Sequence, residues 1–115
     1  MKTSVKNNKL FNDKNKVAVL YSPGYGAGWY TWNQNHIDIL YSPEIVQKVL
    51  DNKRDEITEE FVNKVLEIDK NTDSIYCGGS RSLEVEWMDE GTHFTIDEYD
   101  GFESIIYLDD LKLIA

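Results

Sequence analysis

The segment from residue 83 to residue 107 restricts the possible folds of this chain more than any other part of the sequence. Apolar and polar residues alternate along it, and Glu90-Gly91 and Asp100-Gly101 stand where two-residue β-turns would connect the strands. Turns at both sites would place seven apolar residues on one face of an antiparallel sheet: Leu83, Val85, Trp87, Phe94, Ile96, Ile105 and Tyr107. A shift of one residue would scatter this set, so the pattern predicts a defined β-meander. Asp109-Asp110 predicts a further turn, into a fourth strand at residues 111–115.

The predicted turns also determine which residues face one another across the strands. The predicted pairs are 87 with 94 and 85 with 96 across the first turn, and 96 with 105 and 94 with 107 across the second. On the opposite face, Glu84 would face Asp97, whereas Glu98 would face Glu103 at the end of the apolar face. Like charges that face one another destabilise a sheet slightly, which suggests a cation site or a basic partner; a solvated acidic face explains the same pattern. The candidate protein-interaction residues are Glu84, Glu86, Asp97, Glu98 and Glu103.

The N-terminal part of the chain predicts one strand. Val17–Tyr21 is a continuous β-prone run that ends in Ser-Pro-Gly, as a buried central strand does. Residues 1–15 are rich in Lys and Asn, and we expect them to form a flexible arm or a short edge strand. The remaining residues, 16–115, are long enough for one core and too short for two, so they are expected to form a single domain.

Two helices are predicted by a near-repeat in the middle of the chain. The segment Tyr41–Leu50 aligns with Ile57–Leu66, and each copy has a hydroxyl residue, Ser42 or Thr58, at the N-cap position. Apolar residues recur on one face of each copy, so the two helices can pack as a hairpin over one face of a sheet. The predicted fold class is therefore α+β, with one N-terminal strand, a helical hairpin and a C-terminal antiparallel β-meander in one compact domain.

A run of aromatic residues and glycines after the first strand is the strongest candidate for a ligand site. Glycines allow a close approach of the backbone, and aromatic rings offer flat faces for stacking. The run lacks both the Gly-Lys-Ser/Thr of a P-loop and the glycine spacing of a dinucleotide fold, so an anion would bind to backbone N–H groups. Core packing is the alternative for Trp29 and Trp32. The candidate ligand-binding residues in this run are Tyr21, Gly24, Tyr25, Gly26, Gly28, Trp29, Trp32 and Asn33.

A second flexible segment, Cys77–Arg81, lies between the predicted helices and the meander. Arg81 is an isolated base in an acidic region and is a candidate for holding a phosphate or carboxylate of the same ligand; a surface ion pair is the alternative. Cys77 would need a nearby histidine to act as a nucleophile. The two histidines, His36 and His93, form no helical ligand pair, and we predict no catalytic residue, metal site or cofactor.

The net charge of −9 is distributed unevenly. Residues 71–115 carry eleven acids against Arg81 and Lys112, whereas acids and bases balance in residues 1–70. This acidic half repels nucleic acids and anionic membranes, so a macromolecular partner is expected to be basic; a solubilising role is the alternative. The sequence contains neither a signal-peptide pattern nor a long apolar run, and its single cysteine, Cys77, suits a reducing compartment, so we expect a cytoplasmic protein.

Two blocks of the sequence carry a resemblance to a known family. The first is Val17–Trp29, VAVLYSPGYGAGW, and the second combines Glu86-Trp87, Glu90-Gly91-Thr92 and Asp97–Gly101. They resemble a family of small uncharacterised proteins of bacteriophages and related mobile elements, over most of the chain beyond the N-terminal arm. The resemblance implies a setting in an infected bacterial cell and brings no established activity with it.

In this setting, we expect a non-enzymatic phage protein that counters host defence by binding and sequestering a small nucleotide-like ligand. Exposed aromatic residues on a glycine loop suit a pocket completed by a second subunit, so a homo-oligomer is expected. The alternative is an acidic protein-binding inhibitor that imitates nucleic acid, as an anti-CRISPR protein does. A small enzyme that uses Cys77 or paired carboxylates is a third hypothesis.

Overall fold

Strand β3 (Lys16–Tyr21) is the central element of the fold and confirms the buried strand predicted from the sequence. In the computed structural model, the residues described are 2–24, 28–69 and 75–108. β3 pairs on one side with β2 (Lys9–Phe11) and on the other with β4 (Glu84–Asp89), and β1 (Ser4–Lys6) pairs with β2. These pairings are antiparallel and give a sheet with the order β1-β2-β3-β4.

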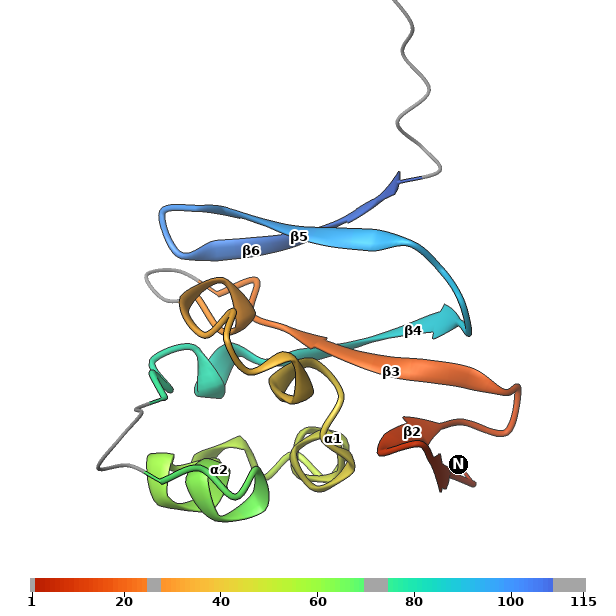
Figure 1. Cartoon of the computed structure of the whole chain (residues 1–115), viewed down its shortest axis with the longest axis horizontal. Helices are drawn as coiled ribbons and strands as arrows, with labels where there is room; N and C mark the ends of the chain where they lie inside the picture. Colours follow the sequence, from red (N-terminus) through yellow and green to blue (C-terminus); the bar gives the residue numbers. More distant parts are fainter. Residues whose placement is uncertain (1, 25–27, 70–74, 109–115) are drawn as a thin grey trace, which may run out of the picture.

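Both faces of strand β3 are covered. Helices α1 (Pro43–Leu50) and α2 (Glu59–Val65) lie on one side. Strands β5 (Phe94–Tyr99) and β6 (Phe102–Tyr107) form a hairpin on the other side, as Figure 1 shows. A strand that is covered on both faces is apolar throughout, which explains the continuous apolar run in β3.

The core consists of two clusters, one on each face of the sheet. The first, on the helix side, contains the buried residues Leu10, Ala18, Leu20, Trp29, Ile39, Ile45, Val46, Val49, Ile57, Val62, Ile75 and Leu83. The second, on the hairpin side, contains Phe11, Val17, Val19, Leu40, Met88 and Ile96. Successive residues of β3 alternate between the two clusters, as the pleat of a strand requires. The chain therefore forms one compact α+β domain.

The prediction of a C-terminal meander is wrong in one strand pairing. Strand β4 pairs with β3, whereas the sequence predicted that it pairs with β5. The β3–β4 register runs from Lys16↔Asp89 to Tyr21↔Glu84, whereas β5 and β6 form a separate two-stranded sheet. The apolar second face of β3 needs a cover, and the hairpin supplies it instead of extending the sheet. The predicted apolar face is therefore divided: Leu83, Val85 and Trp87 belong to the first cluster, and Phe94, Ile96, Ile105 and Tyr107 to the second.

The second predicted turn and its register are confirmed. Asp100 and Gly101 have φ angles of 54° and 88°, as the central residues of a type I′ hairpin turn do. The pairs predicted across this turn form, with Ile96 opposite Ile105 and Phe94 opposite Tyr107. The strand predicted at residues 111–115 lies outside the described residues.

The prediction of a single N-terminal strand is also wrong, because β1 and β2 precede β3 and form a hairpin. Asn7 and Asn8 connect them with φ angles of 54° and 60°, which again corresponds to a type I′ turn. Leu10 and Phe11 on β2 are buried and contribute to different core clusters. The segment 1–15 is thus joined to the domain through its only apolar pair.

Both predicted helices are confirmed, and they begin directly after the predicted N-cap residues. The Thr58 hydroxyl accepts a hydrogen bond from the N–H of Phe61 at 3.1 Å, as an N-cap does. Ser42 precedes α1, but its hydroxyl contacts Glu44 Oε2 at 3.1 Å instead of capping the helix. Among the described residues, no helix is long and apolar enough to cross a membrane.

Candidate functional site

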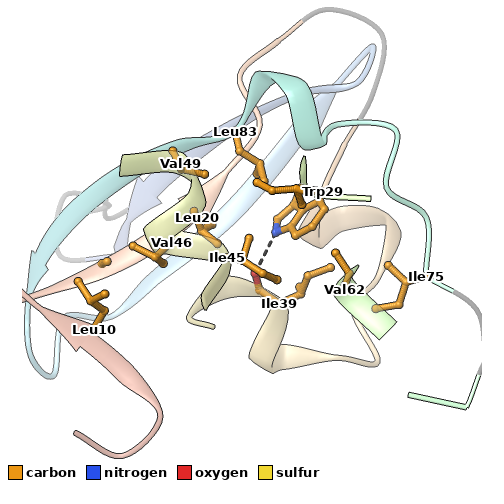
Figure 2. Close-up of a cluster of buried hydrophobic side chains, with 12 residues drawn as sticks. Leu10, Leu20, Trp29, Ile39, Ile45, Val46, Val49, Val62, Ile75 and Leu83 are labelled. Carbon is orange, nitrogen blue, oxygen red and sulfur yellow. Dashed lines mark hydrogen bonds between the residues drawn. The ribbon is translucent and has the colours of Figure 1, made fainter. Parts of the chain in front are cut away.

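Trp29 is a core residue. Its side chain is 0 % exposed, and the indole N–H donates to the carbonyl oxygen of Ile39 at 2.9 Å (Figure 2). The ring belongs to the same cluster as Leu20, Ile45 and Leu83. Core packing, the alternative considered for this residue, therefore applies to Trp29, and a ligand cannot stack on its buried ring.

Asn33 connects two segments that are far apart in the sequence. Its Nδ2 donates to the carbonyl oxygens of Trp29 and Tyr76, both at 2.8 Å, and its Oδ1 accepts from the N–H of Tyr76 at 2.9 Å. We call residues 21–33 the aromatic loop and residues 76–82 the glycine–arginine segment. Because the Asn33 amide is buried and occupied by these contacts, it holds the two segments together instead of facing a ligand.

Glycines allow the backbones of these two segments to approach closely. A Cβ atom on Gly79 would lie 2.5 Å from the carbonyl oxygen of Gly28, and one on Gly24 would lie 2.0 Å from Ser82 Oγ. The Ser22 hydroxyl donates to the carbonyl oxygen of Gly79 at 3.1 Å. Packing between the segments therefore explains these glycines without a ligand.

Glu103 connects the β5–β6 hairpin to the aromatic loop. Its Oε1 accepts from the N–H of Ser22 at 2.8 Å. Its Oε2 accepts from the N–H groups of Trp29 at 2.9 Å and Thr31 at 2.8 Å, and from the Thr31 hydroxyl at 2.8 Å. The residue is 2 % exposed, and its own N–H donates to the carbonyl oxygen of Ser22 at 2.8 Å. A carboxylate thus occupies backbone donors of the loop that was predicted to bind an anion.

Two aromatic rings remain exposed on the outer side of the joined segments. Trp32 is 59 % exposed and Tyr76 is 48 % exposed, and their ring centres lie 5.5 Å apart at an interplanar angle of 49°. Each ring lies against a glycine, because a Cβ atom on Gly28 would be 2.1 Å from Trp32 Cδ1 and one on Gly78 would be 2.2 Å from the Tyr76 hydroxyl oxygen. We call Trp32 and Tyr76 the ring pair.

A groove of about 390 Å³ adjoins the ring pair and shares Tyr76 with it. Its walls come from the start of α2, the residues just before it, and the glycine–arginine segment. The lining residues are Arg54, Asp55, Ile57, Thr58, Glu59, Ile75, Tyr76, Cys77, Gly78, Ser80 and Arg81. The groove therefore combines an aromatic ring, hydroxyl groups and charges of both signs.

The two arginines of the groove differ in their contacts. Arg54 Nε donates to the carbonyl oxygen of Leu83 at 2.7 Å, and its Nη2 lies 3.5 Å from Glu84 Oε2, so this guanidinium is held in place. Arg81 is exposed, and no described residue forms a hydrogen bond or an ion pair with its guanidinium. The surface ion pair considered for Arg81 is thus not formed among the residues that the structure describes.

Cys77 lines the groove but is not activated as a nucleophile. Burial, with a smaller contribution from Glu59, raises the pKa of its thiol from 9.0 to about 11. The thiol is therefore protonated near neutral pH, and the thiolate is the reactive form. The hypothesis of an enzyme that uses Cys77 gains no support from this environment.

The other candidate ligand residues lie elsewhere or outside the described ranges. Tyr21 packs against the second core cluster, on the hairpin side of the sheet, where burial, Glu86 and Glu84 raise the pKa of its hydroxyl. Tyr25 and Gly26 are outside the residues that the structure describes. Of the predicted set, the structure brings Trp32 and Arg81 to one exposed region.

The predicted acidic surface is not assembled as expected. Because β4 pairs with β3, Glu84 lies opposite Tyr21 and not opposite Asp97. Glu86 is partly buried and accepts a hydrogen bond from the Tyr107 hydroxyl. Glu103 does face Glu98 across the hairpin, but its carboxylate turns inward to the aromatic loop. Asp97 and Glu98 remain exposed, and Glu98 Oε1 accepts from the N–H of Gly101 at 2.6 Å.

Two residues of the site region, Tyr76 and Thr31, were not predicted from the sequence, and a third, Glu103, was given a different role. Tyr76 lies in a stretch with no periodic pattern, and Thr31 is one polar residue in an aromatic run, so neither gives a local signal. Glu103 stands at the end of the predicted apolar face, and it was assigned to the acidic surface because it would face Glu98 there. Its burial depends on donors in the aromatic loop, and sequence spacing cannot reveal these.

Among the described residues, no group of three His, Cys, Asp or Glu side chains is arranged to hold a metal ion. Comparison with known proteins gives no match: no protein-family model, no curated protein and no solved structure is significantly similar to this chain.

Proposed function

We propose that the protein binds a small nucleotide-like ligand at the ring pair and the adjoining groove, without transforming it. The observation that carries this proposal is the exposed pair of Trp32 and Tyr76 next to a groove that contains Arg81, whose guanidinium has no partner among the described residues. A base can stack on an exposed aromatic ring, and a guanidinium binds phosphate through two parallel hydrogen bonds.

The charges of the groove favour a ligand with one phosphate over a polyphosphate. Arg81 is the groove cation without a partner among the described residues, since Arg54 is held by Leu83 and Glu84. Asp55 and Glu59 also line the groove, and their carboxylates repel additional negative charge. A nucleoside monophosphate, or a cyclic nucleotide with singly charged phosphodiester groups, suits this balance better than a triphosphate does.

The proposed binding is tested by calorimetric titration of the protein with adenosine, adenosine monophosphate, cyclic mono- and dinucleotides and adenosine triphosphate. We expect a monophosphate or a cyclic nucleotide to bind more tightly than adenosine or the triphosphate. Trp32→Ala should weaken binding about 5- to 150-fold, the range expected for loss of one stacking contact. Arg81→Ala should weaken it about tenfold or more, because a charge-assisted hydrogen bond is lost.

Two matched variants control for general effects of these substitutions. Ile37→Ala removes another large exposed apolar side chain, and Lys53→Ala removes one exposed positive charge, as Arg81→Ala does. Both controls should bind like the unmodified protein. If no nucleotide binds the unmodified protein, or if the control variants weaken binding as much as Trp32→Ala and Arg81→Ala, the proposal is wrong.

We further propose that the ligand is a nucleotide messenger of host defence, sequestered in the cytoplasm of an infected bacterium. The resemblance to small phage proteins supports this setting, and the protonated thiol of Cys77 supports a binding role over catalysis. The large exposed area of the ring pair supports a site that a second copy of the chain closes. Light scattering with and without the bound nucleotide tests the homo-oligomer.

A contact with a basic host protein is the second candidate function, and the tip of the β5–β6 hairpin favours it. Tyr99 is 80 % exposed and stands between the exposed acids Asp97, Glu98 and Asp100. A pull-down of nucleic-acid-binding defence effectors should then weaken with added salt and with Tyr99→Ser. Capture that does not change with salt or with this substitution would exclude the hairpin tip as the contact.

A further inference from the structure

The Glu103 carboxylate is held by the aromatic loop in the way that a protein holds a bound anion. Its two oxygens accept hydrogen bonds from three backbone N–H groups and one hydroxyl group, with donor–acceptor distances of 2.8–2.9 Å. These donors come from Ser22, Trp29 and Thr31, which are not adjacent in the sequence but converge on one point. No described basic side chain pairs with this carboxylate, so its charge is stabilised by oriented dipoles.

We propose that the N–H groups of Ser22, Trp29 and Thr31, together with the Thr31 hydroxyl, form a carboxylate-binding cradle. Glu103 is the resident ligand of this cradle and is tethered to it by the β5–β6 hairpin. All four groups donate a hydrogen bond to the carboxylate, and an ionised carboxylate can only accept hydrogen bonds. A small free monocarboxylate, such as formate, has the same two oxygens and is the class of ligand that the vacated cradle binds.

Glu103 is also a positioning residue for the ring pair. Oε2 binds the N–H groups of Trp29 and Thr31, and these residues enclose the start of the short 3₁₀ helix η1 (Tyr30–Trp32). The backbone that carries Trp32 is thereby fixed from the hairpin, although Glu103 is buried and does not line the groove. This consequence for ligand binding rests on the proposed function, whereas the cradle itself does not.

Removal of the side chain and replacement of the carboxylate by formate test the cradle. Glu103→Ala should lower the melting temperature, and formate should raise it again by about 4 °C or more at concentrations well above its dissociation constant. Sodium chloride at equal ionic strength should have a smaller effect, because a spherical anion cannot place two oxygens against separate donors. If Glu103→Ala unfolds the domain, formate should restore its far-ultraviolet circular dichroism instead.

Two further variants make this test specific to the cradle. Glu98→Ala removes the carboxylate that faces Glu103 across the hairpin; this residue is exposed, and its Oε1 accepts a hydrogen bond from the N–H of Gly101. Formate should not stabilise that variant more than the unmodified protein. Glu103→Gln fills the cradle with an amide whose NH₂ group is directed at donors, so it should lower the melting temperature without any recovery in formate. If formate stabilises Glu103→Ala no more than the unmodified protein, the cradle proposal is overturned.

The outcomes for the cradle and for the proposed ligand can be told apart. Recovery of Glu103→Ala by formate, with no nucleotide bound by the unmodified protein, supports the cradle and rejects the proposed function. When a nucleotide does bind, Glu103→Ala should weaken its binding at least about fivefold and formate should restore it, because the lost stacking on Trp32 returns. Unchanged nucleotide affinity in a folded Glu103→Ala variant would overturn the positioning role.

Discussion

The buried and exposed sides of the aromatic loop differ in what their tryptophans do. Trp29 is 0 % exposed and donates to Ile39 within the first core cluster, whereas Trp32 is 59 % exposed and contacts the ring of Tyr76. The two residues belong to the same run of aromatic residues and glycines in the sequence. Their difference shows that one loop supplies both a core residue and the exposed surface of the candidate site.

The largest expected effect concerns the buried side of the loop. Trp29→Ala should lower the free energy of unfolding by about 3–5 kcal/mol, because it leaves a large cavity and the Ile39 carbonyl oxygen without its partner. Urea denaturation measures this change. Trp29→Phe keeps most of the packing and should have a smaller effect. A loss below about 1 kcal/mol for Trp29→Ala would contradict the assignment of this ring to the core.

Removal of Asn33, which connects the aromatic loop to the glycine–arginine segment, should lower the free energy of unfolding by an intermediate amount. Asn33→Ala removes three hydrogen bonds to Trp29 and Tyr76, and it should lower the free energy of unfolding by about 1–3 kcal/mol. Faster exchange of the Tyr76 amide proton, measured by nuclear magnetic resonance, would show that the glycine–arginine segment is released. Asn35→Ala, at an exposed neighbouring position, is the control and should change neither quantity.

Loss of the Cys77 thiol proton at alkaline pH should lower the free energy of unfolding by a smaller amount. Because its pKa is raised to about 11 in the folded protein, the thiol loses its proton more readily in the unfolded chain. This contribution to stability is fully present below pH 9 and is lost as the pH rises from 9 to 11. Tyr21 and Tyr41 have raised pKa values as well, so Cys77 must be isolated by comparison with Cys77→Ala.

The measurement for Cys77 is the difference in unfolding free energy between the two proteins as a function of pH. We expect this difference to be constant up to pH 9 and then to shrink. Alkylation of the thiol should follow the same titration and be slow at neutral pH. A fast reaction at pH 7–8, as expected for a solvated thiol whose pKa is not raised, would show that the groove exposes the thiol.

The smallest expected effect concerns the exposed side of the loop. Trp32→Ala should change the free energy of unfolding by no more than about 0.5 kcal/mol, because more than half of the side chain is already in water. The same urea denaturation used for Trp29→Ala measures it. A loss comparable with that of Trp29→Ala would mean that both rings are structural, and the exposed surface would then have no separate role.

Part of the fold could be predicted because local chemistry specifies it. Asp100-Gly101 adopts positive φ angles readily, and the alternation on either side gives a single register, so the β5–β6 hairpin was predicted correctly. Thr58 starts α2 for an equally local reason. The Asn7-Asn8 turn carried a similar signal, but without a long alternating pattern beside it the β1–β2 hairpin was not recognised.

The pairing of β4 could not be predicted from local patterns. Glu90-Gly91 is a plausible hairpin turn, and the apolar residues of β4 and β5 match in register, so pairing between these strands satisfied every local rule. Strand β4 pairs with β3 instead. Because β3 is apolar on both faces, the helices bury one face and the hairpin buries the other. The choice depends on burial of the whole core, which no single segment contains.

The sequence alone was sufficient for the α+β class, the central strand and both helices. Hydrophobic periodicity and turn chemistry depend on a few neighbouring residues, so they can be recognised from the sequence. The separation of Trp29 from Trp32 and the inward turn of Glu103 required the folded arrangement. The burial of Trp29 and the hydrogen bonds of Glu103 depend on contacts between the loop, the hairpin and the core. These segments are far apart in the sequence, so local patterns do not predict such contacts.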